Sequence, residues 1–583
     1  MSIKDKLPVS YMLFTSRGRI NRLTYWTVSV FIWTSFYVLF NVLAFTISYF
    51  ATWFIYPLLF WSLIATATKR LHDVNIKGLW LFVILIPVIG PLLLVYLLGF
   101  KKGTLNTNRF GTVPNAASDY FKNPDAEKIP HLKSDQRIVN DITQLNPILV
   151  AKVEVPKTIT ELQDIIKNTN NSISIGGGRF SMGGQTASAN STHIDMRKLN
   201  GVIDFSYQNK TIKVQAGIRW CDIQKFLDEH NLSIKIMQTY ANFTVGGALS
   251  VNCHGRYIGL GSVILSVKSI EVLLANGEIV AASKSHNAEI FFACIGCYNA
   301  IGVITIVELE LEDNIPVKRI HNTMKLTEYK NFFFNQVREN KEIIFHNADI
   351  YPPSYKNIRV VSWIATNQKP TVKTRLMPLS AAYPLERYFI NAFSKSKFGK
   401  WRRENIIDPL LYLNKKIHWR NYEAGYDVME LEPESKKHDT FVLQEYFVPV
   451  AQFELFSVKM TEIFTRFNVN VLNVSIRHAN PDSGSLLAWA REEVFAFVVW
   501  YKQGTNEVEK GKVAVWTREL IDAAIFFNGA YYLPYQAHAT HEQFHKAYPN
   551  AKKLFELKNK LDPEFKFKNI IWDTYYKINQ QSA

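Results

Sequence analysis

Hydrophobic residues concentrate in the first hundred positions of the chain, in three runs that contain no charged side chain. The runs cover residues 26–47, 50–68 and 79–100. The first two are long enough to cross a bilayer as helices, since about 20 apolar residues span its hydrocarbon core. The third is interrupted by Pro87, Gly90 and Pro91, where helical hydrogen bonding fails. The pattern predicts two membrane helices followed by a third apolar segment that bends.

Lysine and arginine flank all three runs. They cluster within residues 4–22, 69–77 and 101–109. Short cytoplasmic loops carry an excess of these residues, so all three clusters are expected in the cytoplasm. Three full crossings would place the last cluster outside, and we therefore expect residues 79–100 to form a re-entrant hairpin. A cleavable signal peptide is excluded because the apolar region is too long and recurs three times. The sequence predicts a multi-pass membrane domain over residues 1–111, with the rest of the chain in the cytoplasm.

Beyond the membrane domain the pattern changes to short strands and amphipathic helices. Residues 112–145 combine turn formers with mixed charge and little periodicity, so we expect a linker there. A helix is expected next, with Thr160 as its N-cap and Gln163 three positions later. Hairpin turns are expected at residues 208–210 and at Asn276-Gly277. This alternation indicates an α+β domain.

A glycine-rich stretch, SIGGGRFSMGGQ at residues 174–185, follows a short apolar run. A dinucleotide fingerprint does not fit, because its third glycine position falls on Ser181 and the chain continues into a strand. A phosphate-binding P-loop does not fit either, because Gln185 follows the last two glycines. Two interpretations remain open from the residues alone: a turn whose amides bind a diphosphate, or an ordinary glycine-rich turn.

Length and charge narrow the class of protein. At 583 residues the chain is too long for a single core. Its net charge of +17 indicates an acidic partner, and without any nucleic-acid-binding motif we expect anionic membrane lipid and no nucleic acid. Four cysteines do not make a disulfide scaffold in so long a chain. Cys294 and Cys297 form a C-x-x-C pair without a second pair, so no metal site is predicted.

Several motifs occur in order between residues 146 and 316. They are the glycine loop, T-V-G-G-A at 244–248, N-C-H-G at 252–255, N-G-E-I at 276–279 and A-E-I-F-F-A at 288–293. In this order the region resembles the FAD-binding (PCMH-type) domain of the vanillyl-alcohol oxidase superfamily. The resemblance implies FAD, with its pyrophosphate held by backbone amides. The cofactor-binding residues it implies are Gly176, Gly177, Gly178, Arg179, Phe180, Ser181, Thr244, Gly246, Gly247, Asn252, His254, Gly255 and Ile304.

The remainder of the chain resembles oxidases of the same superfamily. Residues 541–583 are similar to the segment that closes on the FAD domain, and residues 317–540 are expected to form an α+β substrate, or cap, domain. Decaprenylphosphoryl-ribose oxidases and aldonolactone and alditol oxidases are the branches with the most similar motifs, L-Q-E-Y-F-V-P at 443–449 and V-S-I-R-H-A-N-P-D-S-G at 474–484. The resemblance implies hydride transfer from an alcohol carbon to flavin N5.

The same resemblance indicates which residues take part in catalysis. His254 falls where a side chain lies near the flavin in relatives, although a structural histidine is an equal alternative. Tyr535 stands where the decaprenylphosphoryl-ribose oxidases have a lysine, and Gln444 matches a substrate-side glutamine. The implied catalytic residues are therefore His254, Tyr535 and Gln444. Arg179 replaces the histidine that bonds covalently to flavin in many relatives, so FAD is expected to be non-covalent.

The membrane domain carries a second resemblance. S-R-G-R-I-N-R-L-T-Y-W at 16–26 and K-R-L-H-D-V-N-I-K-G-L-W at 69–80 are typical of a small bacterial membrane domain of unknown function. It implies a bacterial inner membrane but no activity. His72 and Asp73 could bind a metal or a lipid headgroup, or form an anchoring cluster.

Together these features predict an N-terminal α-helical membrane domain, an α+β FAD-binding domain and an α+β cap domain. The predicted function is a membrane-tethered, FAD-dependent oxidation of an alcohol carbon in a sugar, polyol or sugar lactone, which could be carried on a polyprenyl phosphate. The electron acceptor, whether oxygen, a quinone or a protein, stays open. The alternative is a non-catalytic membrane receptor or scaffold with a degenerate flavin fold.

Overall fold

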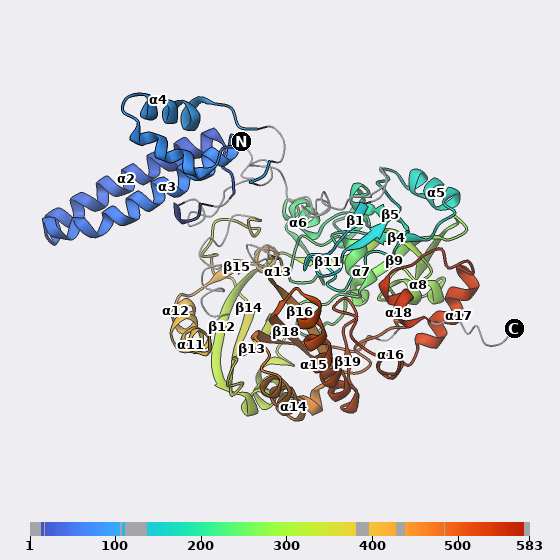
Figure 1. Ribbon diagram of the computed structural model, residues 1–583. Coiled ribbons are helices and arrows are strands. Elements are labelled where there is room, and N and C mark those ends of the chain that lie inside the picture. The colour runs from blue at the N-terminus through green and yellow to red at the C-terminus, as the bar shows by residue number, and fades with distance from the viewer. Residues whose placement is uncertain are drawn as a thin grey trace. The chain divides into compact units, whose positions relative to one another are not determined.

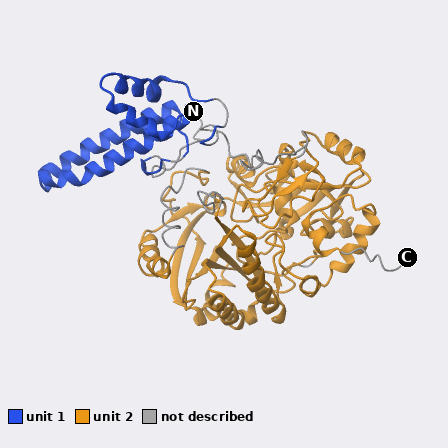
Figure 2. Cartoon of the chain, in the orientation of Figure 1, with its two compact units in different colours: residues 1–119, 380–390 blue, residues 120–379, 391–583 orange. Residues whose placement is uncertain are grey.

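The computed structural model describes residues 13–16, 18–104, 108–110, 137–379, 396–426, 436, 438–482 and 484–576. The chain divides into two compact units (Figure 2). Unit 1 comprises Met1–Asp119 and Ser380–Ile390, and unit 2 comprises Tyr120–Leu379 and Asn391–Ala583. Each unit is described by itself.

Unit 1 is helical in its described part. Its elements are α2 (Arg22–Thr46), a 3₁₀ turn (Tyr49–Ile55) that continues into α3 (Tyr56–Asp73), a 3₁₀ segment (Gly78–Leu85), α4 (Ile89–Val95) and a π-helical turn (Tyr96–Phe100). Asn21 begins α2 by accepting a hydrogen bond from the Thr24 amide. By length and composition, Arg22–Thr46 and Tyr49–Asp73 are apolar enough to cross a membrane. The third apolar run is broken, as its prolines and glycine predict.

The break turns the third run back on itself. Val88 has a φ of 65°, and a Cβ on Gly90 would lie 1.9 Å from the Val83 carbonyl oxygen. Only glycine allows this close approach between the two halves. Leu94, Leu97 and Leu98 then pack against Leu71 and Val74 at the end of α3. The re-entrant path through a bilayer stays a prediction, but the bend that it needs is present.

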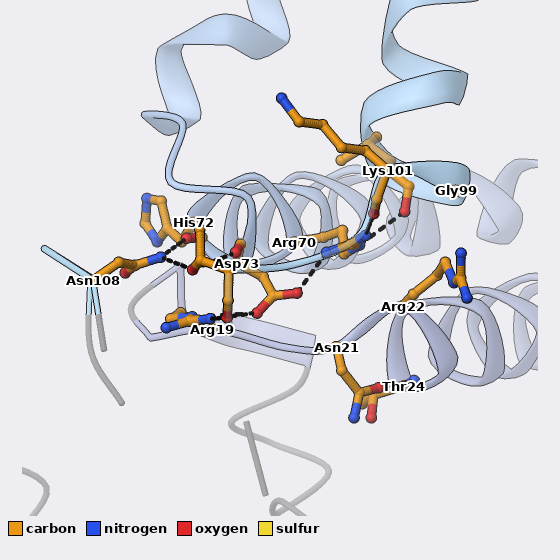
Figure 3. Close-up of polar contacts among 12 residues, drawn as sticks. Arg19, Asn21, Arg22, Thr24, Arg70, His72, Asp73, Gly99, Lys101 and Asn108 are labelled. Atoms are coloured by element: carbon orange, nitrogen blue, oxygen red, sulfur yellow. Dashed lines mark hydrogen bonds and ion pairs between the residues drawn. The ribbon is translucent and has the colours of Figure 1, made fainter. Parts of the chain in front are cut away.

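A buried cluster of charged side chains joins the ends of these segments (Figure 3). Arg19 donates to Asp73 Oδ1 at 3.0 Å, and Arg70 donates to Asp73 Oδ2 at 2.6 Å and to the Leu98 carbonyl at 3.0 Å. The His72 ring stacks on Phe110. Both carboxylate oxygens of Asp73 are thus occupied by arginines, and the described residues include no group of three or more side chains arranged to hold a metal. These contacts favour the interpretation of His72 and Asp73 as part of an anchoring cluster.

The first part of unit 2 contains a parallel three-stranded sheet in the order β3 (Lys152–Glu154), β5 (Thr192–Asp195), β4 (Ile173–Gly176). Between β3 and β4 lies α5 (Ile159–Asn168), whose N-cap is Thr158, so the predicted cap at Thr160 is wrong. Thr158 accepts from the Glu161 amide while Glu161 accepts from the Lys157 amide, so the capping arrangement lies two residues earlier than predicted. The last residues of the expected linker pair as β1 (Arg137–Val139) with β2 (Ile148–Val150), and residues 112–136 lie outside the described residues.

An antiparallel sheet follows. Its strands run in the order β10 (Ile279–Ser283), β9 (Val267–Leu274), β11 (Gly302–Asp313), β7 (Thr211–Gln215) and β6 (Val202–Ser206), and β8 (Leu232–Ile234) pairs with the end of β11. The helices of this region are α6 (Trp220–Asp228), α7 (Val245–Ser250) and α8 (Ala288–Cys294). The two predicted hairpins are confirmed, with Lys210 and Gly277 at positive φ in their turns.

The largest sheet has eight strands (Figure 1). They run in the order β15 (Ile417–Trp419), β12 (Pro316–Lys325), β14 (Asn357–Ala365), β13 (Ile343–Ile350), β17 (Val471–Ala479), β18 (Val494–Gly504), β16 (Asp439–Pro449) and β19 (Ala530–Tyr531). Helices α14 (Phe453–Arg466) and α15 (Glu507–Phe526) cover one face of β16 and β18. Shorter helices are α9 (Tyr329–Phe332), α11 (Lys397–Arg402), α12 (Asp408–Tyr412) and α13 (Arg420–Ala424).

The chain ends on the first part of unit 2. Helices α16 (His541–Ala547), α17 (Ala551–Leu561) and α18 (Ile570–Tyr575) lead the chain back, and the Lys566 carbonyl accepts from the Ile173 amide beside β4. Lys558, fully buried, donates to Asp562 and to the Ala300 and Phe567 carbonyls. The returning helices pack into the main hydrophobic core, which includes both large sheets, and Phe567 packs in a smaller separate core beside β4.

Candidate active site

A cavity of about 320 Å³ lies within unit 2. One wall is formed by the glycine loop and by α7, and another by side chains of β16, β17 and β18. Of the residues predicted from the sequence, those that line it are Gly177, Gly178, Arg179, Phe180, Ser181, Thr244, Gly246, Gly247, His254, Ile304 and Tyr535. The fold therefore brings most of the predicted cofactor-binding residues to one place.

The glycine loop leaves β4 and comes so close to neighbouring segments that side chains are excluded. A Cβ on Gly177 would lie 2.2 Å from Thr244 Oγ1, and one on Gly183 would lie 2.2 Å from the Tyr535 carbonyl oxygen. Thr244 caps α7 by accepting from the Gly247 amide, which fixes the second glycine segment beside the first. Part of the cavity wall on this side is consequently bare glycine backbone, which suits a diphosphate-binding surface.

Orphaned polar atoms show that the cavity is shaped for a polar ligand. Thr186 Oγ1, Gln238 Nε2 and Thr239 Oγ1 are buried at its wall and have no hydrogen-bond partner among the described residues. A buried polar atom without a partner costs about 1–3 kcal/mol. A cofactor with many hydrogen-bonding groups and an aromatic ring system, such as FAD, fits this wall and the stacked rings of Phe180 and Phe243 beside it.

Arg179 lies buried in the middle of the loop. Its φ is 61°, in the left-handed region, and its carbonyl accepts a hydrogen bond from the Ile142 amide. Behind it, His193 is fully buried and bonded to Ser174 through Nδ1. Burial, and next the charges of Arg179 and Arg197, hold the pKa of His193 well below its usual range. The loop thus presents one guanidinium, and no imidazole, at the position predicted to face the cofactor.

A buried carboxylate and imidazole lie opposite the glycine loop. His254 Nε2 and Glu445 Oε1 are 2.5 Å apart, and both side chains are 3% exposed. Tyr535 donates its hydroxyl to Glu445 Oε2 at 3.4 Å. Burial, together with the Glu445 carboxylate, raises the pKa of Tyr535 well above its usual range, so its phenol stays protonated. Glu445 therefore accepts from both predicted residues and is the only carboxylate among the described residues that line the cavity.

Gln444 does not reach the cavity. Its side chain lies on the opposite face of β16, where Nε2 donates to Tyr501 and Thr517 and Oε1 accepts from Tyr446. Successive side chains of a strand point to opposite faces, so Gln444 and Tyr446 share one face and Glu445 takes the other. The alternation of L-Q-E-Y could have identified Glu445 once the face of the sheet was known.

Three further polar residues of the cavity escaped the sequence analysis. Asn473, Ser475 and Arg477 alternate along β17 and line the cavity. Ser475 lies opposite Val498 of β18, which in turn pairs with Glu445 of β16. Arg477 Nε is buried without a hydrogen-bond partner among the described residues. The polar residues at every second position in N-V-S-I-R were the available signal.

Other predicted residues serve the framework. Asn252 donates to Asp482 at 2.6 Å and accepts from the Ile264 amide, and a Cβ on Gly255 would lie 2.3 Å from the Met237 carbonyl oxygen. These two residues and Gly176 lie outside the cavity lining. Cys294 and Cys297 are free and buried, and burial raises the pKa of both thiols.

Comparison with known proteins places these features in families. Residues 150–283 match the family described as FAD binding domain (FAD_binding_4), and residues 13–112 match Protein of unknown function (DUF805). L-gulonolactone oxidase of Mus musculus is 20% identical over 427 residues, which cover 71% of this chain and 92% of that protein. L-gulonolactone oxidase of Bos taurus is 27% identical over 34% of this chain, a match that spans about half (49%) of the bovine protein.

A third relative is a dehydrogenase. Cytokinin dehydrogenase 1 of Arabidopsis thaliana is 27% identical over 179 residues, 29% of this chain and 31% of that protein. The chain thus carries an FAD-binding domain of the vanillyl-alcohol oxidase (PCMH) family, related to L-gulonolactone oxidase and cytokinin dehydrogenase, behind an N-terminal DUF805 domain.

Proposed function

We propose that the chain is a membrane-held FAD-dependent oxidoreductase that oxidises an alcohol carbon of a sugar, polyol or sugar lactone. The observation that carries the proposal is the buried contact of His254 with Glu445 in a cavity whose opposite wall is bare glycine backbone. The lactone oxidases among the relatives support the substrate class. The eight-stranded sheet is the proposed substrate domain.

Oxidation of an alcohol removes a hydride from carbon and a proton from oxygen. FAD, when bound, supplies the hydride acceptor. We assign proton acceptance to Glu445, because its Oε1 is held by His254 while Oε2 faces Tyr535 and the cavity. Tyr535, kept as a phenol by its raised pKa, donates and orients instead of acting as the base. Arg477 is positioned to bind a substrate oxygen from β17.

The proposal also covers how FAD is attached and where in the cell the enzyme lies. FAD is held non-covalently, since an arginine on the loop cannot form a histidyl linkage. The DUF805 match and the two apolar helices support a bacterial inner-membrane location, and we propose that the FAD domain lies on the cytoplasmic side. A sugar carried on a polyprenyl phosphate would then meet the enzyme at the surface where it is held.

The test is anaerobic reduction of the purified full-length chain. Sugar lactones, polyols and a polyprenylphosphoryl sugar are mixed separately with the yellow protein, and bleaching near 450 nm is followed in time. Glu445→Gln keeps the shape of the side chain but removes the proton acceptor, so we expect flavin reduction to slow by about 100-fold or more. FAD content should not change.

Glu462→Gln on the exposed side of α14 is the matched control, since Glu462 pairs with Lys459 at the surface, outside the cavity. It should reduce at the wild-type rate. A colourless full-length protein that takes up no FAD would refute the proposed function. Bleaching of Glu445→Gln at the wild-type rate would refute the role of Glu445. A colourless protein would instead support the scaffold alternative.

A further inference from the structure

A helical segment between β14 and β15 is held to the rest of unit 2 by hydrogen bonds along one side. It runs from α11 through a π-helical turn (Arg403–Ile407) into α12. Arg403 donates to the Leu472 carbonyl at 2.8 Å, Asn357 to Glu404 at 2.7 Å, and Tyr351 to Asp408 at 2.7 Å. The segment is therefore a fixed part of the surface beside the eight-stranded sheet, as its place at the edge in Figure 1 shows.

The other side of this segment is a row of large, exposed apolar side chains, which we call the ridge. The ridge consists of Phe398, Trp401, Ile406, Leu410, Leu411 and Leu413. Phe398 is 67% exposed and Leu413 is 74% exposed, and the rings of Phe398 and Trp401 stack at 5.9 Å. The longest step along the row, from Trp401 to Ile406, spans the π-helical turn, which has more residues per turn than an α-helix.

The exposed charged side chains of the ridge segment are mainly basic. Residues 396–416 contain six basic and two acidic side chains. The two acids, Glu404 and Asp408, are bonded inward as described above, whereas Lys397, Lys415 and Lys416 are exposed. A row of aromatic and leucine side chains flanked by lysines is the composition of helices that lie in the headgroup layer of anionic bilayers.

We propose that the ridge docks on an anionic membrane surface, with its apolar side chains in the headgroup layer and its lysines on lipid phosphates. An exposed apolar patch alone would fit a protein partner as well. The flanking lysines, and the two apolar helices that the same chain carries in unit 1, favour lipid. The docking is independent of the reaction proposed above.

A hydrogen bond connects the ridge segment to the wall of the cavity. Arg403, in the π-helical turn of the ridge segment, donates to Asn473 Oδ1 at 3.2 Å, and Asn473 lines the cavity. The side of the cavity formed by β17 would therefore be held close to the headgroups. This arrangement suits a substrate whose reacting group belongs to a lipid.

Spin labelling of the full-length chain in nanodiscs tests the proposal. Phe398→Cys is labelled with a nitroxide, and Val508→Cys on α15 is the control, since Val508 is 69% exposed but lies beside Glu507 and Glu509. The native thiols interfere little: three are buried, and burial raises the pKa of Cys221 to about 12. Power saturation compares collisions with oxygen, which partitions into lipid, and with a water-soluble nickel chelate.

In nanodiscs of equal phosphatidylglycerol and phosphatidylcholine, we expect oxygen to dominate at position 398 and nickel at position 508. Adding Lys415→Glu and Lys416→Glu should move position 398 several-fold toward nickel. Equal nickel access at both positions would overturn the proposal. Shielding of position 398 from both reagents would indicate a protein partner and would overturn it as well.

Discussion

Glu445 and Arg179 show at the scale of single residues how the site is assembled. Glu445 is buried and accepts hydrogen bonds from His254 and Tyr535. It faces a cavity at whose wall several buried polar atoms have no hydrogen-bond partner among the described residues. Arg179 stands on the opposite wall in a left-handed backbone conformation. We propose Glu445 as the proton acceptor, and Arg179 stands where the family resemblance leads us to expect a flavin-linked histidine.

The identity of Arg179 predicts how FAD leaves the protein. Because no histidine occupies this loop position, acid or denaturant should release all of the FAD into solution. The measurement is precipitation of purified protein with trichloroacetic acid, followed by the absorbance of the supernatant and pellet near 450 nm. Flavin that stays with the washed pellet would show a covalent bond and would contradict the assignment of the loop.

At the scale of elements, the glycine loop packs closely against α7, and we predict that FAD binding depends on this contact. Gly177 and Gly246 each leave too little room for a side chain, with Thr244 and Ala216 as their neighbours. The eight-stranded sheet has a comparable dependence on buried polar contacts. His346 of β13 bonds to Ser362 of β14 at 2.7 Å and to Tyr329 of α9 at 3.2 Å.

Gly177→Ala should lower FAD content strongly while the protein still folds. The added methyl group would lie 2.2 Å from Thr244 Oγ1, so the loop must move away from α7. The ratio of absorbance near 450 nm to that at 280 nm in purified protein measures this loss. Gly511→Ala is the control, because no atom lies within 4 Å of its added Cβ.

Gly511 lies inside the helix α15, where alanine is favoured over glycine by about 1 kcal/mol. The control should therefore keep its FAD and unfold at a slightly higher temperature. Full FAD occupancy in Gly177→Ala would mean that the loop does not contact the cofactor.

His346 predicts a dependence of stability on pH. Burial lowers its pKa to about 3, from an unfolded value near 6.5, with the charge of His478 adding to the effect. Between these values the unfolded chain binds one proton more than the folded chain, so stability falls as the pH drops from 6.5 toward 3. This one residue contributes up to about 1.4 kcal/mol per pH unit.

Thermal unfolding at pH 6.5, 5.5 and 4.5 measures this dependence. His346→Gln lacks the titrating group, and its unfolding temperature should fall less steeply with pH than that of the wild type. His286→Gln, at an exposed position, is the control and should follow the wild type. Parallel curves for His346→Gln and the wild type would show that His346 does not titrate on unfolding.

At the scale of the whole molecule, the two apolar helices and the cavity belong to different compact units. Unit 1 holds the two apolar helices and its own small core, and unit 2 holds the cavity and a continuous core of its own. The chain has a net charge of +17 and carries a DUF805 domain followed by an FAD-binding domain. The two functions should therefore be separable.

Deletion of residues 1–111 should yield a protein that keeps FAD but no longer behaves as an integral membrane protein. We expect it to sediment with anionic vesicles through the ridge and to be released by about 0.5 M salt, because screening shortens electrostatic attraction to a few ångströms. Sedimentation of the truncated and full-length proteins after salt and carbonate washes measures this. Loss of FAD on truncation would show that the units depend on each other.

The sequence by itself determined what short stretches of chain decide. Apolar length identified the helices α2 and α3, prolines and Gly90 marked the bend in the third run, and the turn residues 208–210 and Asn276-Gly277 marked the hairpins. The ordered glycine motifs were enough to identify the FAD domain, which the family match confirms. Each of these signals lies within a few residues, where propensity and steric limits act directly.

Only the tertiary structure decided the other wall of the cavity. Glu445 meets His254 across 191 residues of sequence, and Asn473, Ser475 and Arg477 reach the same space from another strand. A strand offers both faces to its surroundings, so the choice of Glu445 over Gln444 depends on which face packs on α15. That choice is made by long-range packing, which one-dimensional spacing does not encode.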